Sequence, residues 1–196
     1  CIGALGYVNC TPSSDSEKPL PLGTSLPFPT ADCDGPTADL TPVVQELMET
    51  NLNAQSEARE ELLNPDVITV VTCGTGTPLG AVRAQACTAV FVNGQFLLFD
   101  AGDGAQRSME NLLFPISDLT AVFVTHFHSD HMADVGEVVS RSWLRGRRTS
   151  LTVYGGEGIS RVVEGFNSIY VLDTNYRVAH HGAERFPSDV APGIPS

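Results

Sequence analysis

Short apolar runs separated by polar turns dominate the last two thirds of the chain. Such runs, rich in β-branched and aromatic residues, are typical of buried or half-buried strands. Five of them stop abruptly at polar or glycine-containing segments: 67–72, 86–92, 95–100, 121–124 and 151–154. Asn93-Gly94 separates two of these runs and favours a two-residue hairpin turn. The pattern therefore predicts a β-sheet that begins near residue 66.

Helical patterns alternate with these strands. Thr41-Pro42 provides an N-cap and a first helical residue, and apolar side chains recur at helical spacing up to Leu52. Further helical patterns occupy the segments 106–113, 133–143 and 159–166. The segment 169–177 is ambiguous, and the tail 187–196, with three prolines and a glycine, is expected to be a loop. This order predicts an α/β (α+β) fold with a mixed sheet and flanking helices.

Composition divides the chain into three parts. Residues 1–40 are rich in Pro, Ser, Thr, Asp and Gly, which predicts a largely irregular linker. Residues 41–65 are predicted to form a helical spacer, and residues 66–196 the folded domain. Acidic residues exceed basic ones by nine before residue 67 and by three after it. The net charge of −12 does not favour a nucleic-acid-binding surface, although the domain itself is nearly neutral.

The first ten residues indicate the remnant of an export signal. The chain begins with Cys1 rather than Met, and an apolar segment runs to Cys10, ahead of the polar linker. An extracytoplasmic location, periplasmic or lipoprotein-anchored, is the main expectation, with a cytoplasmic location as the alternative. Five cysteines at irregular spacing specify neither a disulfide framework nor a zinc site. No apolar run reaches the ~20 residues of a membrane-spanning helix.

The clearest chemistry follows the apolar run 121–124. Four potential metal ligands lie within six residues: His126, His128, Asp130 and His131. Alternate side chains of an extended segment point the same way, so His126 and His128 can reach one ion together. Asp130 and His131 follow where the chain must turn and can face the same pocket from another side. Imidazole and carboxylate are ligands of Zn, Mn and Fe, so a metal site is predicted here.

This HxHxDH pattern resembles the signature of the metallo-β-lactamase superfamily. The strand and GTG turn at 67–78, and the LTVYGGEGI segment at 151–159, resemble the ribonuclease Z-like branch. The resemblance covers residues 67–182 and implies half of an αββα sandwich. It also implies that this half is the N-terminal part of a domain truncated at its C-terminus, because the family's remaining His, Asp and His ligands come from a second half.

The resemblance implies a two-metal hydrolase. It assigns His126 and His128 to one ion and Asp130 and His131 to a second. Two Zn²⁺ ions per complete domain are expected, with Mn²⁺ or Fe as alternatives. A metal-bound hydroxide would be the nucleophile, and Asp130 would orient or deprotonate the attacking water. The resemblance also places Asp100 beside the metal pocket, where it would orient a ligand histidine.

A ribonuclease Z-like phosphodiesterase is therefore the leading prediction. A sulfatase-like or lactonase-like hydrolase of the same fold is the alternative, and a non-catalytic binding module is the alternative of another class. The expected substrate is a small molecule or a phosphodiester. The sequence is compatible with a homodimer.

Three other features have two readings each. The basic cluster Arg141–Arg148 is interpreted as a solvated helix C-terminus in preference to a phosphate contact. His180-His181 can add a ligand, but adjacent histidines rarely serve one ion from a regular element. A thiol nucleophile at Cys73 or Cys87 is disfavoured, since nothing places a base near either residue.

Overall fold

A computed structural model describes most of the chain. The described residues are 6–7, 38–39, 41–80 and 82–196. The signal remnant and linker predicted for residues 1–40 lie almost entirely outside them. None of the helices in the described part is both long and apolar enough to cross a membrane.

The chain divides into two compact units at residue 52. In the first unit, β1 (Gly6–Tyr7) pairs antiparallel with β2 (Ala38–Asp39). The helix α1 (Thr41–Leu62) begins in this unit and ends in the second, which comprises residues 53–196. The predicted helical start at Thr41 is confirmed.

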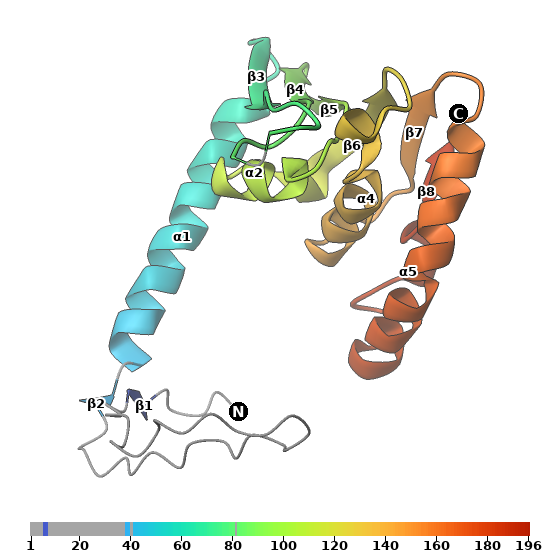
Figure 1. The fold of residues 1–196 in the computed structure, drawn as a ribbon. Coiled ribbons are helices and arrows are strands. Elements are labelled where there is room, and N and C mark those ends of the chain that lie inside the picture. Colours follow the sequence, from blue (N-terminus) through green and yellow to red (C-terminus); the bar gives the residue numbers. More distant parts are fainter. Residues whose placement is uncertain (1–5, 8–37, 40, 81) are drawn as a thin grey trace, which may run out of the picture. The chain divides into compact units, whose positions relative to one another are not determined.

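The second unit is built around a six-stranded mixed sheet (Figure 1). Its strands follow one another in space as in sequence: β3 (Thr69–Gly74), β4 (Cys87–Val92), β5 (Gln95–Phe99), β6 (Leu119–Val124), β7 (Leu151–Gly155) and β8 (Gly193–Pro195). The pairs β3–β4 and β4–β5 are antiparallel, and the pairs from β5 to β8 are parallel. The hairpin at Asn93-Gly94 is confirmed, with φ of 50° and 71°. Positive φ at both positions is the geometry of a type I′ turn.

Helices cover one face of this sheet. They are α2 (Ala105–Asn111), α3 (Ser129–Met132), α4 (Val135–Leu144) and α5 (Ile159–His181), with 3₁₀ turns at η1 (Ile116–Asp118) and η2 (Ser188–Val190). Met109, Val138 and Val163 from α2, α4 and α5 join one core with buried strand residues such as Phe96 and Val153. The predicted helices are confirmed. The ambiguous segment 169–177 belongs to α5.

The expectation that the tail 187–196 is a loop is wrong. Residues 193–195 add β8 to the edge of the sheet, parallel to β7. Asn167 of α5 holds this strand, because its side chain accepts the Gly193 N–H and donates to the Gly193 carbonyl, both at 3.0 Å. Pro195 is compatible with this position because an edge strand needs hydrogen bonds on one side only.

The other face of the sheet is apolar and partly open. Phe99, Phe123 and Tyr154 stack across three neighbouring strands, with ring centroids 4.9 Å apart in each pair. Tyr154 is 40% exposed, and Val70 on the first strand is 61% exposed. Among the described residues, the helices with buried side chains in the core pack on the opposite face. Within residues 53–80 and 82–196, helices therefore cover one side of the sheet.

Candidate metal centre

The polar motif lies at one edge of the sheet. Phe99 at the end of β5 pairs with Phe123 of β6, so the two parallel strands end side by side. Asp100 follows the first strand, and Thr125 follows the second. The segment 125–131, here called the metal loop, continues from the second strand into the short helix α3. The topology therefore brings Asp100 to the loop that carries all four predicted ligands.

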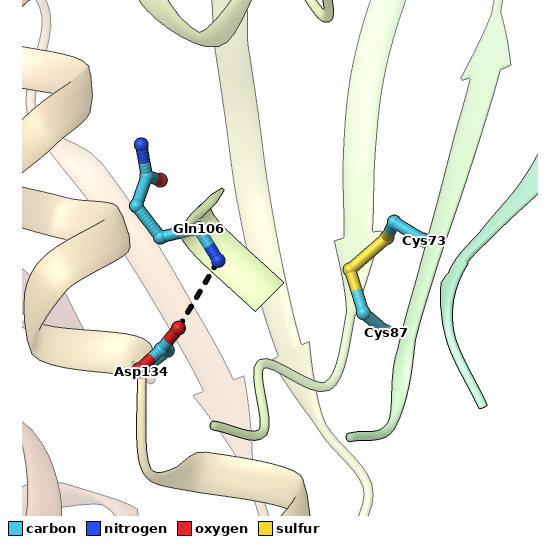
Figure 2. The surroundings of a disulfide bond; sticks show 4 residues. All are labelled: Cys73, Cys87, Gln106 and Asp134. Atoms are coloured by element: carbon cyan, nitrogen blue, oxygen red, sulfur yellow. Dashed lines mark hydrogen bonds between the residues drawn. A yellow bond between two sulfur atoms is a disulfide. The ribbon is translucent and has the colours of Figure 1, made fainter. Parts of the chain in front are cut away.

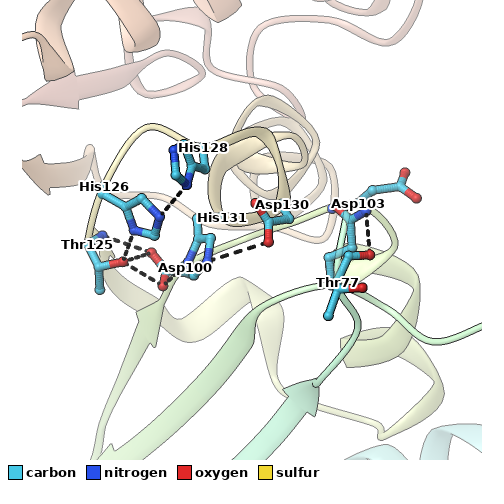
Figure 3. A network of polar contacts seen from close by, with 9 residues as sticks. Thr77, Asp100, Asp103, Thr125, His126, His128, Asp130 and His131 are labelled. Atoms are coloured by element: carbon cyan, nitrogen blue, oxygen red, sulfur yellow. Dashed lines mark hydrogen bonds and ion pairs between the residues drawn. The ribbon is translucent and has the colours of Figure 1, made fainter. Parts of the chain in front are cut away.

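Asp100 fixes the start of the metal loop (Figure 3). Its Oδ1 accepts the Thr125 N–H at 2.8 Å, and its carboxylate accepts the Thr125 hydroxyl at 2.9–3.0 Å. Its own N–H donates to the carbonyl of Phe123 at 2.8 Å. Asp100 is 7% exposed and has a φ of 59°, which Asp tolerates better than most residues. A buried acid at this turn therefore ties the ends of two strands together.

Asp100 also contacts a histidine of the motif, as the resemblance implied. Its Oδ2 lies 2.7 Å from His131 Nδ1. A neutral His131 that donates Nδ1–H to this carboxylate keeps its Nε2 lone pair for another partner. The nearest carboxylate oxygen on that side is Oδ2 of Asp130, 3.7 Å from His131 Nε2. The two predicted ligands of a second ion, Asp130 and His131, therefore lie together, and Asp100 contacts the opposite nitrogen of His131.

His126 and His128 form a second pair. His126 Nε2 lies 3.0 Å from His128 Nδ1, and the hydroxyl of Thr125 lies 3.1 Å from His126 Nδ1. Two imidazoles that share a tetrahedral Zn²⁺ have ligand nitrogens about 3.3 Å apart, given Zn–N bonds of about 2.05 Å. The ring of His126 also lies 4.0 Å, centroid to centroid, from that of His131. The 3.0 Å separation of the two histidine nitrogens is close to this value.

The four side chains do not converge on one point. In the described part of the chain, no group of three or more His, Cys, Asp or Glu side chains is placed to hold an ion. The donors fit divalent metal chemistry in kind and in pairs. The structure therefore brings the predicted ligands together as two pairs and not as one cluster.

Backbone contacts that the sequence did not reveal support the loop from below. The Ala86 N–H donates to the carbonyl of Asp130 at 3.1 Å, and the Ala101 N–H donates to that of His131 at 2.8 Å. Gly102 packs so closely that an added Cβ would lie 2.0 Å from the Asp130 carbonyl oxygen. Only Gly102 carried a signal in the sequence, as part of a glycine-containing turn after a strand.

Asp134 follows the metal loop in sequence and accepts a hydrogen bond from the Gln106 N–H (Figure 2). Burial raises its pKa above the ordinary value of 3.8, while hydrogen bonds from the N–H groups of Gln106 and Gly104 act in the opposite direction. The Gln106 N–H lies 3.1 Å from Asp134 Oδ2. The Gln106 side chain is buried, and neither its nitrogen nor its oxygen has a partner in the described structure. The region behind the loop is therefore polar and tightly enclosed.

The basic cluster has a structural role that neither interpretation anticipated. Arg147 is 1% exposed, and burial lowers its pKa to about 10, so it stays charged at neutral pH. Each of its five N–H donors has an acceptor: Ser142 Oγ and the carbonyls of Val139, Thr149, Val190 and Ala191. Arg141 and Arg145 pair with Glu137 and Glu110. The interpretation of a solvated helix end is therefore wrong for Arg147, which fastens the tail to α4.

The remaining candidates do not reach the motif. α5 begins at the edge that carries the metal loop and is about 34 Å long, so His180 and His181 at its end lie far from that edge. In the described structure the His181 ring packs against Phe186, 5.3 Å away. Cys73 and Cys87 are joined by a disulfide that the cysteine spacing did not specify, and neither thiol can act as a nucleophile in this state.

The chain is similar to known proteins over about half to two thirds of its length. Residues 80–174 match the family model of the Metallo-beta-lactamase superfamily. Ribonuclease Z of Methanosarcina mazei is 33% identical over 129 residues, which cover 65% of this chain and 41% of that protein. Ribonuclease Z of Mycolicibacterium gilvum is 34% identical over 119 residues, which cover 59% and 42%. The chain thus spans about two fifths of the length of the curated relatives it matches.

A solved structure of human tRNase Z, short form, covers 52% of this chain at 22% identity, with a TM-score of 0.48. The expectation of an extracytoplasmic location is wrong. The finding that contradicts it is the match to relatives that are ribonuclease Z proteins.

Proposed function

We propose that this chain carries part of a metallo-β-lactamase superfamily domain of the ribonuclease Z-like branch. On this premise, it belongs to a metal-dependent phosphodiesterase acting on RNA. The premise rests on the family match over residues 80–174 and on identities near one third to two ribonucleases Z. The observation that carries the proposal is the His126–His128 pair, with facing nitrogens 3.0 Å apart beside a His131 held by Asp100.

The chain's own residues divide the work at this site. His126 and His128 would hold one divalent ion, proposed to be Zn²⁺, and Asp130 and His131 would hold a second. A bound divalent ion supplies Lewis acidity toward a phosphoryl oxygen and lowers the pKa of water. Asp130 would orient the attacking water and accept its proton. Asp100 acts through His131, because the Nδ1 contact fixes which imidazole nitrogen is free.

The domain boundaries are part of the proposal. We assign residues 66–196 to the N-terminal part of the domain, with 41–65 as a helical spacer and 1–40 as a linker. Two observations support this assignment. The relatives are more than twice as long as the matched segment, and the sheet face with Phe99, Phe123 and Tyr154 is apolar and partly open. A sheet is stable when both apolar faces are buried, so this face suits a second sheet layer.

The net charge of −12 does not weigh against RNA at this site. Most of the net negative charge lies before residue 67, outside residues 80–174 that match the family model, and the rest of the chain is close to neutral. Divalent ions at the acidic and histidine-rich loop would add further positive charge where a phosphodiester binds. The overall charge alone was therefore a weak guide to the substrate.

Hydrolysis assays on the full-length protein test the proposal. A precursor tRNA with a 3′ extension and bis-p-nitrophenyl phosphate are compared with p-nitrophenyl sulfate and a lactone, each with Zn²⁺ or Mn²⁺. Cleavage of the two phosphodiesters, lost on chelation and in the Asp130→Asn variant, is expected. Preferential cleavage of the sulfate ester or the lactone would contradict the substrate class. Metal binding without any hydrolysis would instead indicate a binding module.

A further inference from the structure

Cys73 and Cys87 are joined by a disulfide between neighbouring strands (Figure 2). Their Cα atoms are 5.0 Å apart, and the residues are 4% and 1% exposed. Cys73 lies where the register of β3 on β4 shifts, between Thr72 and Gly74. Such an irregularity weakens the local hydrogen-bond ladder. The disulfide therefore holds a strand end that backbone hydrogen bonds secure less well.

One of the two bonded cysteines borders a cavity. Cys73 lines a cavity of about 210 Å³, together with Thr75, Arg83 and Ser108. Arg83 is exposed and donates to the Thr75 hydroxyl at 3.2 Å, and no carboxylate pairs with it among the described residues. A guanidinium at this position attracts an anionic thiolate toward the sulfur of Cys73.

The same disulfide lies next to the support of the metal loop. Ala86, the neighbour of Cys87, donates its N–H to the Asp130 carbonyl at 3.1 Å and accepts the Gly102 N–H at 2.9 Å. Gln85 continues the contact, since its N–H donates to the carbonyl of Asp103 at 2.9 Å. The segment 85–87 therefore links the disulfide to the backbone of Asp130 within two residues.

We propose that the Cys73–Cys87 disulfide is a redox-responsive clasp on the metal loop, and that a low-molecular-weight thiol reduces it through the Arg83 cavity. The thiolate attacks the sulfur of Cys73, the sulfur–sulfur bond breaks, and Cys87 leaves as a thiolate that takes a proton from water. A second thiol attacks the mixed disulfide and releases Cys73. Two thiols are oxidised to one disulfide while the protein gains two electrons and two protons. The effect on metal binding rests on the proposed function, whereas the reduction itself does not.

The test uses the full chain with Cys1, Cys10 and Cys33 replaced by Ser, so that only Cys73 and Cys87 can be alkylated. Reduction by glutathione at pH 7 is followed by alkylation and intact mass spectrometry. Arg83→Gln is expected to slow reduction about threefold or more, and Arg161→Gln, on an exposed face of α5, is expected to leave the rate unchanged. Hydrogen exchange of oxidised and reduced protein, without metal, is expected to rise on reduction at residues 85–87 and 130–131.

Two results would overturn the clasp. One is equal reduction rates in the Arg83 variant and its control. The other is unchanged exchange at the metal loop after complete reduction. Zn²⁺ titration of both redox forms separates this inference from the proposed function. If exchange changes but neither form binds metal, the metal centre fails and the clasp stands. If both forms bind metal equally and exchange is unchanged, the clasp fails and the metal centre stands.

Discussion

Two clusters of polar side chains stand out in this acidic chain, one around Arg147 and one around His126 and His128. They differ in whether their own neighbours already provide hydrogen-bond partners. Arg147, at the C-terminus of α4, has an acceptor for each of its five N–H donors and is almost fully buried. His126 and His128, at the end of β6, are exposed and have nitrogens that face one another at 3.0 Å. The first cluster is complete without a ligand, whereas the second has donors that suit an ion. The comparison teaches that the partners of a cluster, and not its density in sequence, indicate its role.

The largest expected effect is the loss of stability on replacing Arg147. Arg147→Met removes the hydrogen bonds that Arg147 donates to four carbonyls and to the Ser142 hydroxyl. A buried carbonyl left without a partner carries a desolvation cost. We expect the free energy of unfolding to fall by about 3 kcal/mol. Arg148→Met, which removes one exposed contact to the Arg185 carbonyl, is the matched control, with a change within about 0.5 kcal/mol. Urea unfolding measures both, and equal effects would break the comparison.

Gly102→Ala tests the support of the metal loop. An added Cβ would lie 2.0 Å from the Asp130 carbonyl oxygen, so the loop must shift. We expect a loss of about 2 kcal/mol of stability, as for other overpacked sites. Gly165→Ala in α5 meets nothing within 4 Å and should raise stability by about 0.5–1 kcal/mol. Thermal unfolding followed by circular dichroism distinguishes the two, and a stable Gly102 variant would refute the tight contact.

Asp100→Asn tests whether Asp100 orients His131 in the histidine cluster. The amide keeps an acceptor for the Thr125 N–H but turns a donor toward His131 Nδ1, which forces the other tautomer. Loss of such a partner typically weakens metal affinity tenfold or more, and we expect about tenfold. Calorimetric titration with Zn²⁺ measures the affinity, and ¹⁵N chemical shifts of the imidazole report the tautomer. An unchanged tautomer would show that Asp100 does not orient His131.

Asp134→Asn has the smallest expected effect. Because burial raises the folded-state pKa of Asp134, the folded protein binds this proton more tightly than the unfolded chain does. Ionisation therefore costs stability as the pH rises above 3.8 and through the raised pKa. The Asn variant should match or exceed wild type at pH 7, by no more than about 0.5 kcal/mol, and lose this advantage near pH 3. Urea unfolding at the two pH values checks the sign.

Much of the fold followed from local patterns. The hairpin at Asn93-Gly94, the buried strand before His126 and the helix start at Thr41 each carry a signal within a few residues. The tail strand at 193–195 did not, because it depends on Asn167 and Arg147, which are distant in sequence. Local propensity for a loop is overridden there by tertiary hydrogen bonds.

The site shows the same division. All four candidate ligands and Asp100 could be named from one motif and one strand end. The Ala86 contact to the Asp130 carbonyl and the Cys73–Cys87 disulfide could not, because backbone contacts and cysteine pairing leave no pattern in a single sequence. The location was misjudged for a related reason, since a short apolar N-terminal segment specifies no compartment by itself.

Zn²⁺ titration of three forms of the chain tests the central claim most directly. These are the wild type, His126→Ala/His128→Ala and His180→Ala/His181→Ala, which removes the other histidine pair. Isothermal calorimetry, with elemental analysis of the dialysed protein, measures affinity and stoichiometry. The account predicts that the first double variant loses one Zn²⁺ site that the wild type has, and that the second double variant keeps it. An unchanged zinc stoichiometry and affinity after loss of His126 and His128, or loss of zinc binding with His180 and His181, would contradict it.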